Sequence, residues 1–474
     1  MINEARQRWK YIISDLVSTT VAVLAFYAAR FYMFDSIRMS HRDSLNSFML
    51  SKGSQAGILT LIAVMMATYY ISGNYDTVIL RSRLRELTST LICAAVGTLV
   101  FFFTALLNDV APERITNYEM LGLLLCLLFV CVYIPRYLLT RHTSRMIQSG
   151  LWANDTLVIG TGTKAREIAA NLSGRYRQMA MRVVGFVAVP GSETRAEIDS
   201  LPVYAFDDLS DVVSRLGIKQ LIIEPHDDSK QTTVELINRL FPLDLPMYIT
   251  PDMYQLMTAR LRLSNVVGMP LIDISRTEMP MSTLNIKRLS DIVLSAMALI
   301  VTAPLMAVIA VAIKRGSKGP VFYRQERVGY HKKKFNILKF RTMTVDAEEN
   351  GPALSSENDP RITGVGRTLR RYRLDELPNF WNVLKGDMSI VGPRPEREHF
   401  IKQIIERAPH YTLVHQVRPG ITSLGMVQYG YANTVDGMIE RMRYDLIYLE
   451  NVSFLVDIKI LIYTVNTVIG GKGM

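Results

Sequence analysis

Four segments near the start of the chain are long and apolar enough to cross a lipid bilayer, and they constrain the fold more than any other feature. A membrane-spanning helix needs about 20 mostly apolar residues. Segments of this kind lie at 13–34, 56–71, 87–107 and 118–139, and the second is short and rich in Thr, Met and Tyr. We therefore predict that residues 1–145 form four transmembrane helices.

Basic residues orient these helices. They stand before the first helix, between the second and third, and after the fourth: Arg6, Arg8, Lys10, Arg81, Arg83, Arg85, Arg141 and Arg145. By the positive-inside rule these places are cytoplasmic. The net charge of +11 favours contact with anionic membranes or phosphorylated ligands. Nucleic acid is the competing partner class, but no basic helix or aromatic-basic RNA signature is found, so we expect no nucleic-acid partner.

Residues 150–255 change to short β-rich runs separated by helical stretches, which predicts a Rossmann-like cytoplasmic domain. The runs at 156–159, 183–189, 220–223 and 246–250 are typical of buried parallel strands. The first leads into Gly160-Thr-Gly162, a turn that lets backbone amides approach a phosphate. The acidic residue expected after the second strand is missing, because Val187-Ala-Val-Pro190 stands there. Both a nucleotide-type regulatory ligand and a purely structural role stay open.

A further apolar stretch at 289–313 follows a predicted linker at 256–284. It contains Asp291 near its start and Pro304 in its middle. Basic residues flank both ends: Lys287, Arg288, Lys314, Arg315 and Lys318. A spanning helix with positive charge at both ends conflicts with the positive-inside rule, and proline kinks a helix. We therefore expect a re-entrant helix that bends at Pro304 and returns to the cytoplasmic face.

The segment from Arg373 to Glu396 (RLDELPNFWNVLKGDMSIVGPRPE) holds the chemically richest residues. Asp375 and Glu376 are adjacent carboxylates, and Arg394 lies in a Gly-Pro-Arg-Pro turn. An isolated Asp-Glu pair is most often the start of a helix. Chemistry on a nucleotide diphosphate instead requires at least two groups: a nucleophile or metal ligand, and a rigidly held cation beside it that binds phosphate.

The stretch from Lys287 to Gly470 resembles the bacterial polyprenyl-phosphate hexose-1-phosphate transferases, in particular the long, monotopic-type phosphoglycosyl transferases. Its motifs occur in the family's order: Gly319-Pro-Val-Phe-Tyr-Arg-Gln-Glu-Arg327-Val-Gly329, Lys339-Phe-Arg341-Thr-Met343, the Asp375-Glu376 block, Arg418-Pro-Gly420-Ile-Thr422, and Tyr444-Asp445 with Asp457. The resemblance implies a membrane protein of α plus α/β class, with a mostly α catalytic domain at 285–474.

The resemblance also implies an activity. A sugar 1-phosphate passes from a UDP-sugar to polyprenyl (undecaprenyl) phosphate at the bacterial inner membrane, UMP is released, and exopolysaccharide, capsule or O-antigen assembly begins. Asp375 is expected to be the nucleophile that forms an aspartyl-phosphosugar intermediate. Glu376 is expected to associate with Mg²⁺, which prefers one or two carboxylates plus phosphate oxygens. Arg394 and Arg370 are expected to bind substrate phosphate, with Lys339 and Arg341 as further candidates.

The sequence also suggests roles for residues outside this predicted site, and it leaves the sugar and two alternative functions open. Arg371 and Arg373 are interpreted as membrane-surface cations, and Asp387 as a turn residue. After Arg418-Pro-Gly420 the string around Gln428 departs from many relatives, so glucose, galactose and N-acetylated sugars stay open. The alternatives are a non-catalytic regulator or scaffold of glycan synthesis, and a sugar-nucleotide epimerase or dehydratase suggested only by the Gly160 turn. We expect the membrane block to serve dimerisation or regulation.

Overall fold

The computed structural model divides the chain into two compact units. One comprises Met1–Glu224 with Pro251–Pro270, and the other Pro225–Thr250 with Leu271–Met474. The structure describes residues 4–33, 39, 44–76, 81–106, 114–174, 177–189, 197–224, 230–250, 271–274, 279–345, 347, 359–430 and 432–469. The predicted linker at 256–284 lies largely outside these residues, and the predicted three-part domain division stays a prediction.

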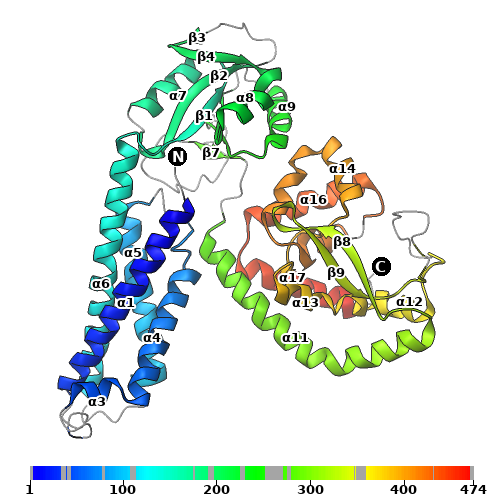
Figure 1. Cartoon of the computed structure of the whole chain (residues 1–474). Helices are drawn as coiled ribbons and strands as arrows, with labels where there is room; N and C mark the ends of the chain where they lie inside the picture. The colour runs from blue at the N-terminus through cyan, green and yellow to red at the C-terminus, as the bar shows by residue number, and fades with distance from the viewer. Residues whose placement is uncertain are drawn as a thin grey trace. The chain divides into compact units, whose positions relative to one another are not determined.

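The N-terminal part of the first unit is a bundle of apolar helices (Figure 1). Four of its helices are long enough and apolar enough to cross a membrane: α1 (Glu4–Met33), α4 (Lys52–Ile71), α5 (Arg83–Phe101, continued by the π-helical turn Phe102–Leu106) and α6 (Arg114–Gln148). A short helix, α3 (Leu45–Met49), precedes α4. Ser51 and Ser82 cap α4 and α5 by accepting hydrogen bonds from backbone N–H groups in the first turn. The four predicted membrane helices are confirmed as apolar helices.

Charged side chains lie inside this bundle. Arg136 on α6 is fully buried, and its guanidinium lies 2.5 Å from the Asp15 carboxylate on α1 and 3.6 Å from Glu86 on α5. It also stacks over the Tyr69 ring of α4, 4.6 Å from the ring centroid. Arg81 pairs with Glu86 at 3.0 Å. One balanced cluster of two cations and two anions therefore ties all four long helices together.

The rest of the first unit is a sheet with helices, as predicted. The sheet has seven strands in the order β3-β4-β2-β1-β5-β6-β7, in which β4, β2, β1 and β5 pair in parallel, and β3 and β7 pair antiparallel to their neighbours at the two edges. The elements are β1 (Asn154–Ile159), α7 (Thr163–Ser173), a 3-10 turn at Arg177–Met179, β2 (Met181–Ala188), β3 (Glu197–Ile198), β4 (Leu201–Ala205), a 3-10 turn at Phe206–Asp208, α8 (Leu209–Leu216) and β5 (Gln220–Ile223). The predicted strands at 156–159, 183–189 and 220–223 are confirmed as β1, β2 and β5.

The glycine turn between β1 and α7 lies close to the end of β5. Gly160 has a φ of +133°, and a Cβ at this position would come within 2.4 Å of the Glu224 carbonyl oxygen. Only glycine fits this combination of backbone angle and close approach. The Glu224 carboxylate lies 3.8 Å from Lys164 in the first turn of α7.

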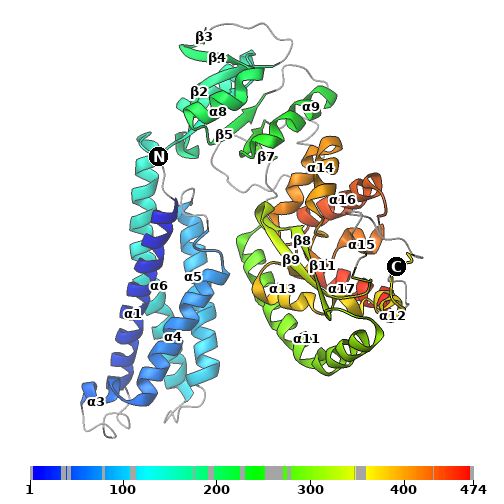
Figure 2. The same cartoon turned by 45° about the vertical axis from the view of Figure 1, so that its right-hand side comes forward.

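The second unit is mostly helical and contains two two-stranded sheets, β8–β9 and β10–β11, besides the strands β6 and β7 of the seven-stranded sheet (Figure 2). In chain order it contains α9 (Lys230–Leu240), a 3-10 turn at Phe241–Leu243, β6 (Met247–Ile249), β7 (Ile272–Asp273), α11 (Met281–Gly316), β8 (Phe322–Val328), a 3-10 turn at Tyr330–Lys332, β9 (Lys334–Phe340), α12 (Gly364–Arg371), the 3-10 turn η6 (Leu374–Glu376), α13 (Asn379–Lys385), β10 (Ser389–Val391), α14 (Glu398–Arg407), a 3-10 helix at Pro409–Gln416, β11 (Gly420–Thr422), α15 (Leu424–Gln428), α16 (Val435–Glu450) and α17 (Phe454–Ile469). The pairs β6–β7 and β8–β9 are antiparallel, and β10–β11 is parallel. The predicted strand at 246–250 is confirmed as β6.

The helix α11 is the longest apolar helix of this unit and bends along its length (Figures 1 and 2). It continues through Pro304, the one residue inside it that cannot donate a backbone hydrogen bond. Asp291 is buried. Its carboxylate accepts hydrogen bonds from the Ser389 hydroxyl at 2.7 Å and from the Ile390 N–H at 3.1 Å. The acidic residue in this apolar helix therefore faces protein and anchors β10.

Candidate active site

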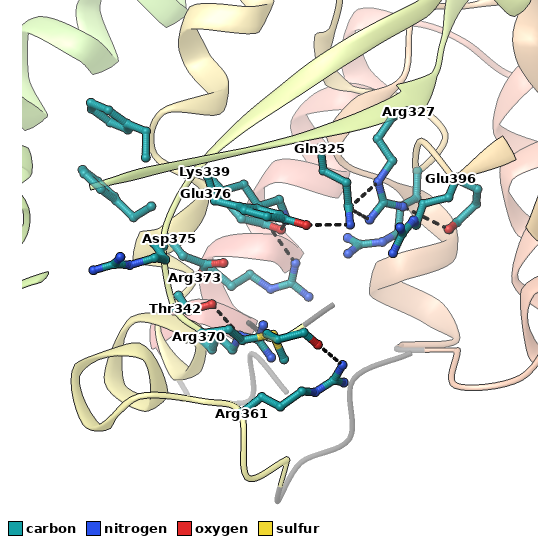
Figure 3. Close-up of a pocket in the computed structure, with 18 of the residues that line it drawn as sticks. Gln325, Arg327, Lys339, Thr342, Arg361, Arg370, Arg373, Asp375, Glu376 and Glu396 are labelled. Atoms are coloured by element: carbon teal, nitrogen blue, oxygen red, sulfur yellow. Dashed lines mark hydrogen bonds and ion pairs between the residues drawn. The ribbon is translucent and has the colours of Figure 1, made fainter. Parts of the chain in front are cut away.

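A cavity of about 410 Å³ opens between the β8–β9 hairpin, the turn η6 and the loop that follows β10 (Figure 3). Its charged lining is unbalanced. Nine basic residues line it: Arg327, Lys339, Arg341, Arg361, Arg370, Arg373, Arg394, Arg397 and Arg441. Among the residues that the structure describes, three carboxylates line it, those of Asp375, Glu376 and Glu396. A cavity with this surplus of positive charge is suited to a ligand that carries several negative charges.

The two adjacent carboxylates lie on the short turn η6. Arg373, which precedes the turn, adopts left-handed backbone angles (φ 52°, ψ 25°), an uncommon conformation for a residue with a side chain. Leu374 and Leu377 on either side of the dyad pack against the apolar cluster of Phe340 with residues of α11 and α12. The apolar neighbours anchor the turn, so that Asp375 and Glu376 line the cavity between them.

The β8–β9 hairpin supplies the opposite wall. Because side chains alternate along a strand, Tyr323, Gln325 and Arg327 lie on one face of β8, and Tyr323 is the register partner of Lys339 on β9. The Lys339 ammonium lies 2.6 Å from a Glu376 oxygen, and Arg373 lies 3.4 Å from the other oxygen. Figure 3 shows Lys339, Glu376 and Arg373 clustered beside Asp375.

The environment separates the pKa values of the two carboxyl groups. Burial, followed by the negative charge of Glu376, raises the pKa of Asp375 to about 6. Burial also acts to raise the pKa of Glu376, but Lys339, Arg373 and Arg394 together outweigh it and hold that pKa well below its usual value. Glu376 is therefore a firmly ionised, cation-bound carboxylate, whereas Asp375 is the carboxylate with the higher basicity.

The arginine turn follows β10. The parallel pairing of β10 with β11 continues through hydrogen bonds from the Gly392 N–H to the Thr422 carbonyl and from the Gly420 N–H to the Pro393 carbonyl. A Cβ at Gly392 would come within 2.3 Å of the Arg418 carbonyl oxygen, so the close approach of these two loops requires glycine. The loops thereby hold Arg394 at the wall of the cavity.

Helix α16 supports the arginine turn from behind through two residues one helical turn apart. Arg441 pairs with the buried carboxylate of Glu396, which also lies 3.4 Å from Arg327. Asp445 accepts hydrogen bonds from the Gly425 N–H at 2.9 Å, from the backbone N–H of Arg394 and from the Ser423 hydroxyl. Burial raises the pKa of Asp445 to about 6. These contacts fix both ends of the turn that carries Arg394.

Two predicted basic residues are held mainly by protein groups. The Arg341 guanidinium donates to the backbone carbonyls of Ser317 and Lys318 at 2.9 and 2.7 Å, which are the carbonyls that follow the end of α11. Arg370 donates from Nε to the Thr342 hydroxyl at 2.9 Å. Both side chains line the cavity. Arg341 therefore pins the end of α11 to β9 in addition to any role toward a ligand.

The structure brings all six predicted site residues to one cavity: Asp375, Glu376, Arg394, Arg370, Lys339 and Arg341. Their individual roles stay predictions. The expectation that Arg373 is a surface cation is wrong, because its side chain is only 15% exposed and pairs with Glu376. Arg371, by contrast, is exposed, as expected. Asp387 pairs with Lys385 at 2.9 Å in the turn after α13, which agrees with a turn role.

Sequence reasoning assigned no role to Arg327, Glu396 and Arg441, which form the second charged cluster of the cavity. Arg327 lies in the Gly319–Gly329 motif, and Glu396 ends the Arg373–Glu396 segment. Both could therefore have been predicted as site residues from the sequence. Arg441 lies in no recognised motif. Its position four residues before Asp445 on one helix face becomes informative only once both are seen to contact the same turn.

The carboxylates of the cavity are the candidate ligands for a metal ion. Among the residues that the structure describes, no group of three or more His, Cys, Asp or Glu side chains comes together. Two adjacent carboxylates at a cavity wall nevertheless match Mg²⁺, which uses one or two protein carboxylates and takes its other ligands from water and substrate phosphates. Both Glu376 oxygens are already paired with cations, whereas Asp375 is not so compensated. The residues fit a metal ion that arrives together with a diphosphate.

Comparison with known proteins connects this geometry to one family. Residues 282–471 match the family described as Bacterial sugar transferase. The UDP-N-acetylgalactosamine-undecaprenyl-phosphate N-acetylgalactosaminephosphotransferase of Aeromonas hydrophila is 42% identical over 40% of this chain and 44% of its own length. The undecaprenyl-phosphate glucose phosphotransferase of Komagataeibacter xylinus is 31% identical over 77% of this chain and 68% of its own length. The undecaprenyl-phosphate galactose phosphotransferase of Salmonella typhimurium is 30% identical over 73% and 75%.

Coverage differs among these relatives. The chain spans only about half the length of several curated relatives that it matches, including the Aeromonas protein. It spans more than two thirds of the Komagataeibacter and Salmonella proteins. Among solved structures, UDP-D-quinovosamine 4-dehydrogenase from Vibrio fischeri is 14% identical, covers 26% of this chain and 93% of its own, and has a TM-score of 0.21. A structural likeness of that size supports no further conclusion.

Proposed function

This chain belongs to the bacterial sugar transferase family, and we propose that it transfers a sugar 1-phosphate from a UDP-sugar to polyprenyl (undecaprenyl) phosphate with release of UMP. The observation that carries the proposal is the pair of buried carboxylates, Asp375 and Glu376, in a cavity where basic residues outnumber acidic ones. A diphosphate supplies the negative charge that this cavity lacks. The product would initiate the assembly of an exopolysaccharide, a capsule or an O-antigen.

Asp375 is the nucleophile in this proposal. Its pKa of about 6 leaves it mostly ionised at neutral pH while keeping it more basic than an ordinary aspartate. One carboxylate oxygen attacks the β-phosphorus of the UDP-sugar, and the bond from that phosphorus to the bridging oxygen breaks. The electron pair leaves with UMP, and an aspartyl-phosphosugar remains. A phosphate oxygen of the polyprenyl phosphate then attacks the same phosphorus and releases the Asp375 carboxylate.

The basic residues hold the phosphates during both steps. Arg394, on a turn fixed at both ends, offers a guanidinium whose fork matches two phosphate oxygens. Arg370 approaches from α12, and Lys339 neutralises Glu376 and leaves it oriented toward the site. Glu376 is the residue that would hold Mg²⁺, in exchange for its present partners Lys339 and Arg373, and the ion when bound would supply charge neutralisation to the diphosphate. Because both substrates use one phosphate pocket in turn, ping-pong kinetics are expected.

Contacts at both ends of α11 support the re-entrant arrangement. Near its start, Asp291 bonds to β10, and near its end, Ile309 and Ile313 pack against Phe340 and Leu369. A helix that crossed the bilayer would carry one of these ends away from the fold that the other contacts. We therefore propose that α11 dips into the cytoplasmic leaflet and returns, with the cavity at the cytoplasmic interface, where a polyprenyl phosphate and a cytosolic UDP-sugar meet.

The experiment that tests the activity uses purified full-length protein and a UDP-sugar labelled in its β-phosphate. The label is expected to stay on the wild-type protein when acceptor is omitted, and not on Asp375→Asn. Equal labelling of both proteins would overturn the nucleophile assignment. UMP release screened across UDP-glucose, UDP-galactose and their N-acetylated counterparts identifies the sugar. If none of these donors releases UMP, the non-catalytic regulator or scaffold is favoured instead.

The N-terminal membrane block has a separate proposed role in dimerisation or regulation. The catalytic residues all lie after residue 280, so the bundle is free to serve assembly. Removal of residues 1–280 is expected to change the oligomeric state measured in detergent while UMP release persists. An unchanged assembly would contradict this role.

A further inference from the structure

A second cavity, of about 380 Å³, lies in the C-terminal unit apart from the candidate active site. The first turns of α11 form one wall, β10 forms the floor, and the start of α17 forms the other wall. The apolar side chains that line it include Ile286, Leu294, Ile390, Val391, Ile458 and Leu461. None of its lining residues also lines the catalytic cavity. The volume is in the range of cavities that hold a small-molecule ligand.

The charged groups in this second cavity are paired with protein groups in or next to it. Lys287 lies 2.6 Å from the Asp457 carboxylate, whose other oxygen accepts a hydrogen bond from the Tyr448 hydroxyl at 2.7 Å. The Asp291 carboxylate accepts from Ser389 and from the Ile390 N–H. Because these groups already have partners, the surface left for an occupant is hydrocarbon. An apolar occupant is favoured, since a polar one would lose its hydration without compensation.

The rim of the cavity continues into exposed apolar surface on the same helices. Ile286 and Leu294 on α11 are 45% and 40% exposed, and Phe454 at the start of α17 is 56% exposed. The helix α11 is itself long and apolar enough to lie in a membrane. This inference rests on the membrane placement of α11 proposed above, which makes the molecules of the bilayer the nearest ones to the opening of this second cavity, called the groove from here on.

We propose that this groove binds one acyl chain of a bilayer phospholipid. Lys287 is neutralised by Asp457, so the groove has no built-in selection for the phosphate of a particular lipid. Without such selection, occupancy follows abundance, and phospholipids far outnumber any polyprenyl lipid. The floor of the groove is β10, which leads directly into Gly392 and the turn of Arg394. A bound chain would thus back the strand that positions the arginine turn.

The test uses full-length protein in vesicles of phosphatidylethanolamine and phosphatidylglycerol that carry a photoreactive group within an acyl chain. Crosslinks on the wild-type protein are expected at the groove-lining residues of α11 and α17. Ile458→Trp fills the groove and is expected to lower these crosslinks about tenfold. Ile462→Trp is the matched control, because Ile462 is an exposed isoleucine on the same helix that does not line the groove, and it should leave them unchanged.

Two outcomes would overturn the proposal. Equal crosslinking in wild type, Ile458→Trp and Ile462→Trp would mean general contact with the bilayer and no bound chain. Displacement of the phospholipid crosslinks by polyprenyl phosphate added at a ratio of one per protein would assign the groove to the isoprenoid chain. If Ile458→Trp does not fold, crosslink positions on the wild-type protein, mapped by mass spectrometry, still decide between groove and outer helix surface. Neither readout depends on the transferase activity.

Discussion

Two regions of this molecule bury charged side chains, and they do so in opposite ways. In the helix bundle, Arg136 and Arg81 are matched by Asp15 and Glu86, with contacts of 2.5 to 3.6 Å. In the candidate active site, nine basic residues face three carboxylates among the residues that the structure describes. A balanced, closed cluster satisfies itself and has nothing left for a ligand, whereas an unbalanced one around a cavity is completed by an anionic ligand. Charge balance thus separates a structural cluster from a functional one.

The largest expected effect tests the functional side of this comparison. Asp375→Asn is expected to lower UMP release by ~10⁴-fold or more, because the nucleophile is lost. Its stability should not fall. The pKa of Asp375 is raised in the folded protein, so at neutral pH ionisation of this group opposes folding, and that cost is absent at pH values below the unfolded pKa. Thermal unfolding measured at pH 7.5 checks this. If Asp375→Asn unfolds at a lower temperature than the wild type, the cavity charges are structural and the contrast with the helix bundle fails.

The next effect tests the structural side. Arg136→Met leaves Asp15 and part of the charge of Glu86 uncompensated in the bundle, and is expected to cost about 3–5 kcal/mol of stability. Adding Asp15→Leu removes the stranded carboxylate and should restore most of that loss. The measurement is unfolding in lipid vesicles, with UMP release expressed per folded molecule as the control. Turnover should be unaffected, and a fall like that of Asp375→Asn would mean that the bundle charges take part in catalysis.

A smaller effect is expected where structure supports function. Asp445→Asn weakens the acceptor that holds the Arg394 backbone, Gly425 and Ser423, and should lower kcat/KM by about 10–100-fold, mainly by raising KM for the UDP-sugar. Asp387→Asn is the matched control, since Asp387 pairs with Lys385 outside the cavity and should change kcat/KM less than about twofold. Equal effects of the two substitutions would show that Asp445 has no special role in positioning the turn.

The smallest effect concerns pH. Asp375 must be ionised to attack, and its pKa is about 6, so the rate should fall about tenfold per pH unit below pH 6 and level off above it. Glu376, whose pKa is held below its usual value, should add no change in this range. The pKa of Asp445 is also raised to about 6, so the profile is measured in Asp445→Asn as well. If the acid limb disappears in that variant, Asp445 is its source and the assignment to Asp375 fails.

Much of the fold could be predicted because its signals are local. The apolar length of α1, α4, α5 and α6 depends only on composition, and the strands β1, β2, β5 and β6 are short apolar runs between turn residues. A bend in α11 was expected because Pro304 lies inside this helix. By contrast, the sequence contained no sign that Asp15 and Arg136, 121 residues apart, would meet. Pairing over such a separation depends on how the helices pack.

The sequence by itself determined which segments are the candidates for the chemistry, namely the dyad of Asp375 and Glu376 and the turn of Arg394. Only the tertiary structure decided which basic residues lie in the cavity beside these segments. Arg371 and Arg373 are two residues apart, yet Arg371 is exposed and Arg373 enters the cavity, because left-handed backbone angles at Arg373 redirect the chain. The two carboxyl groups are adjacent in the sequence but acquire different pKa values for a similar reason, because the electrostatic environment of each is set by its neighbours in space.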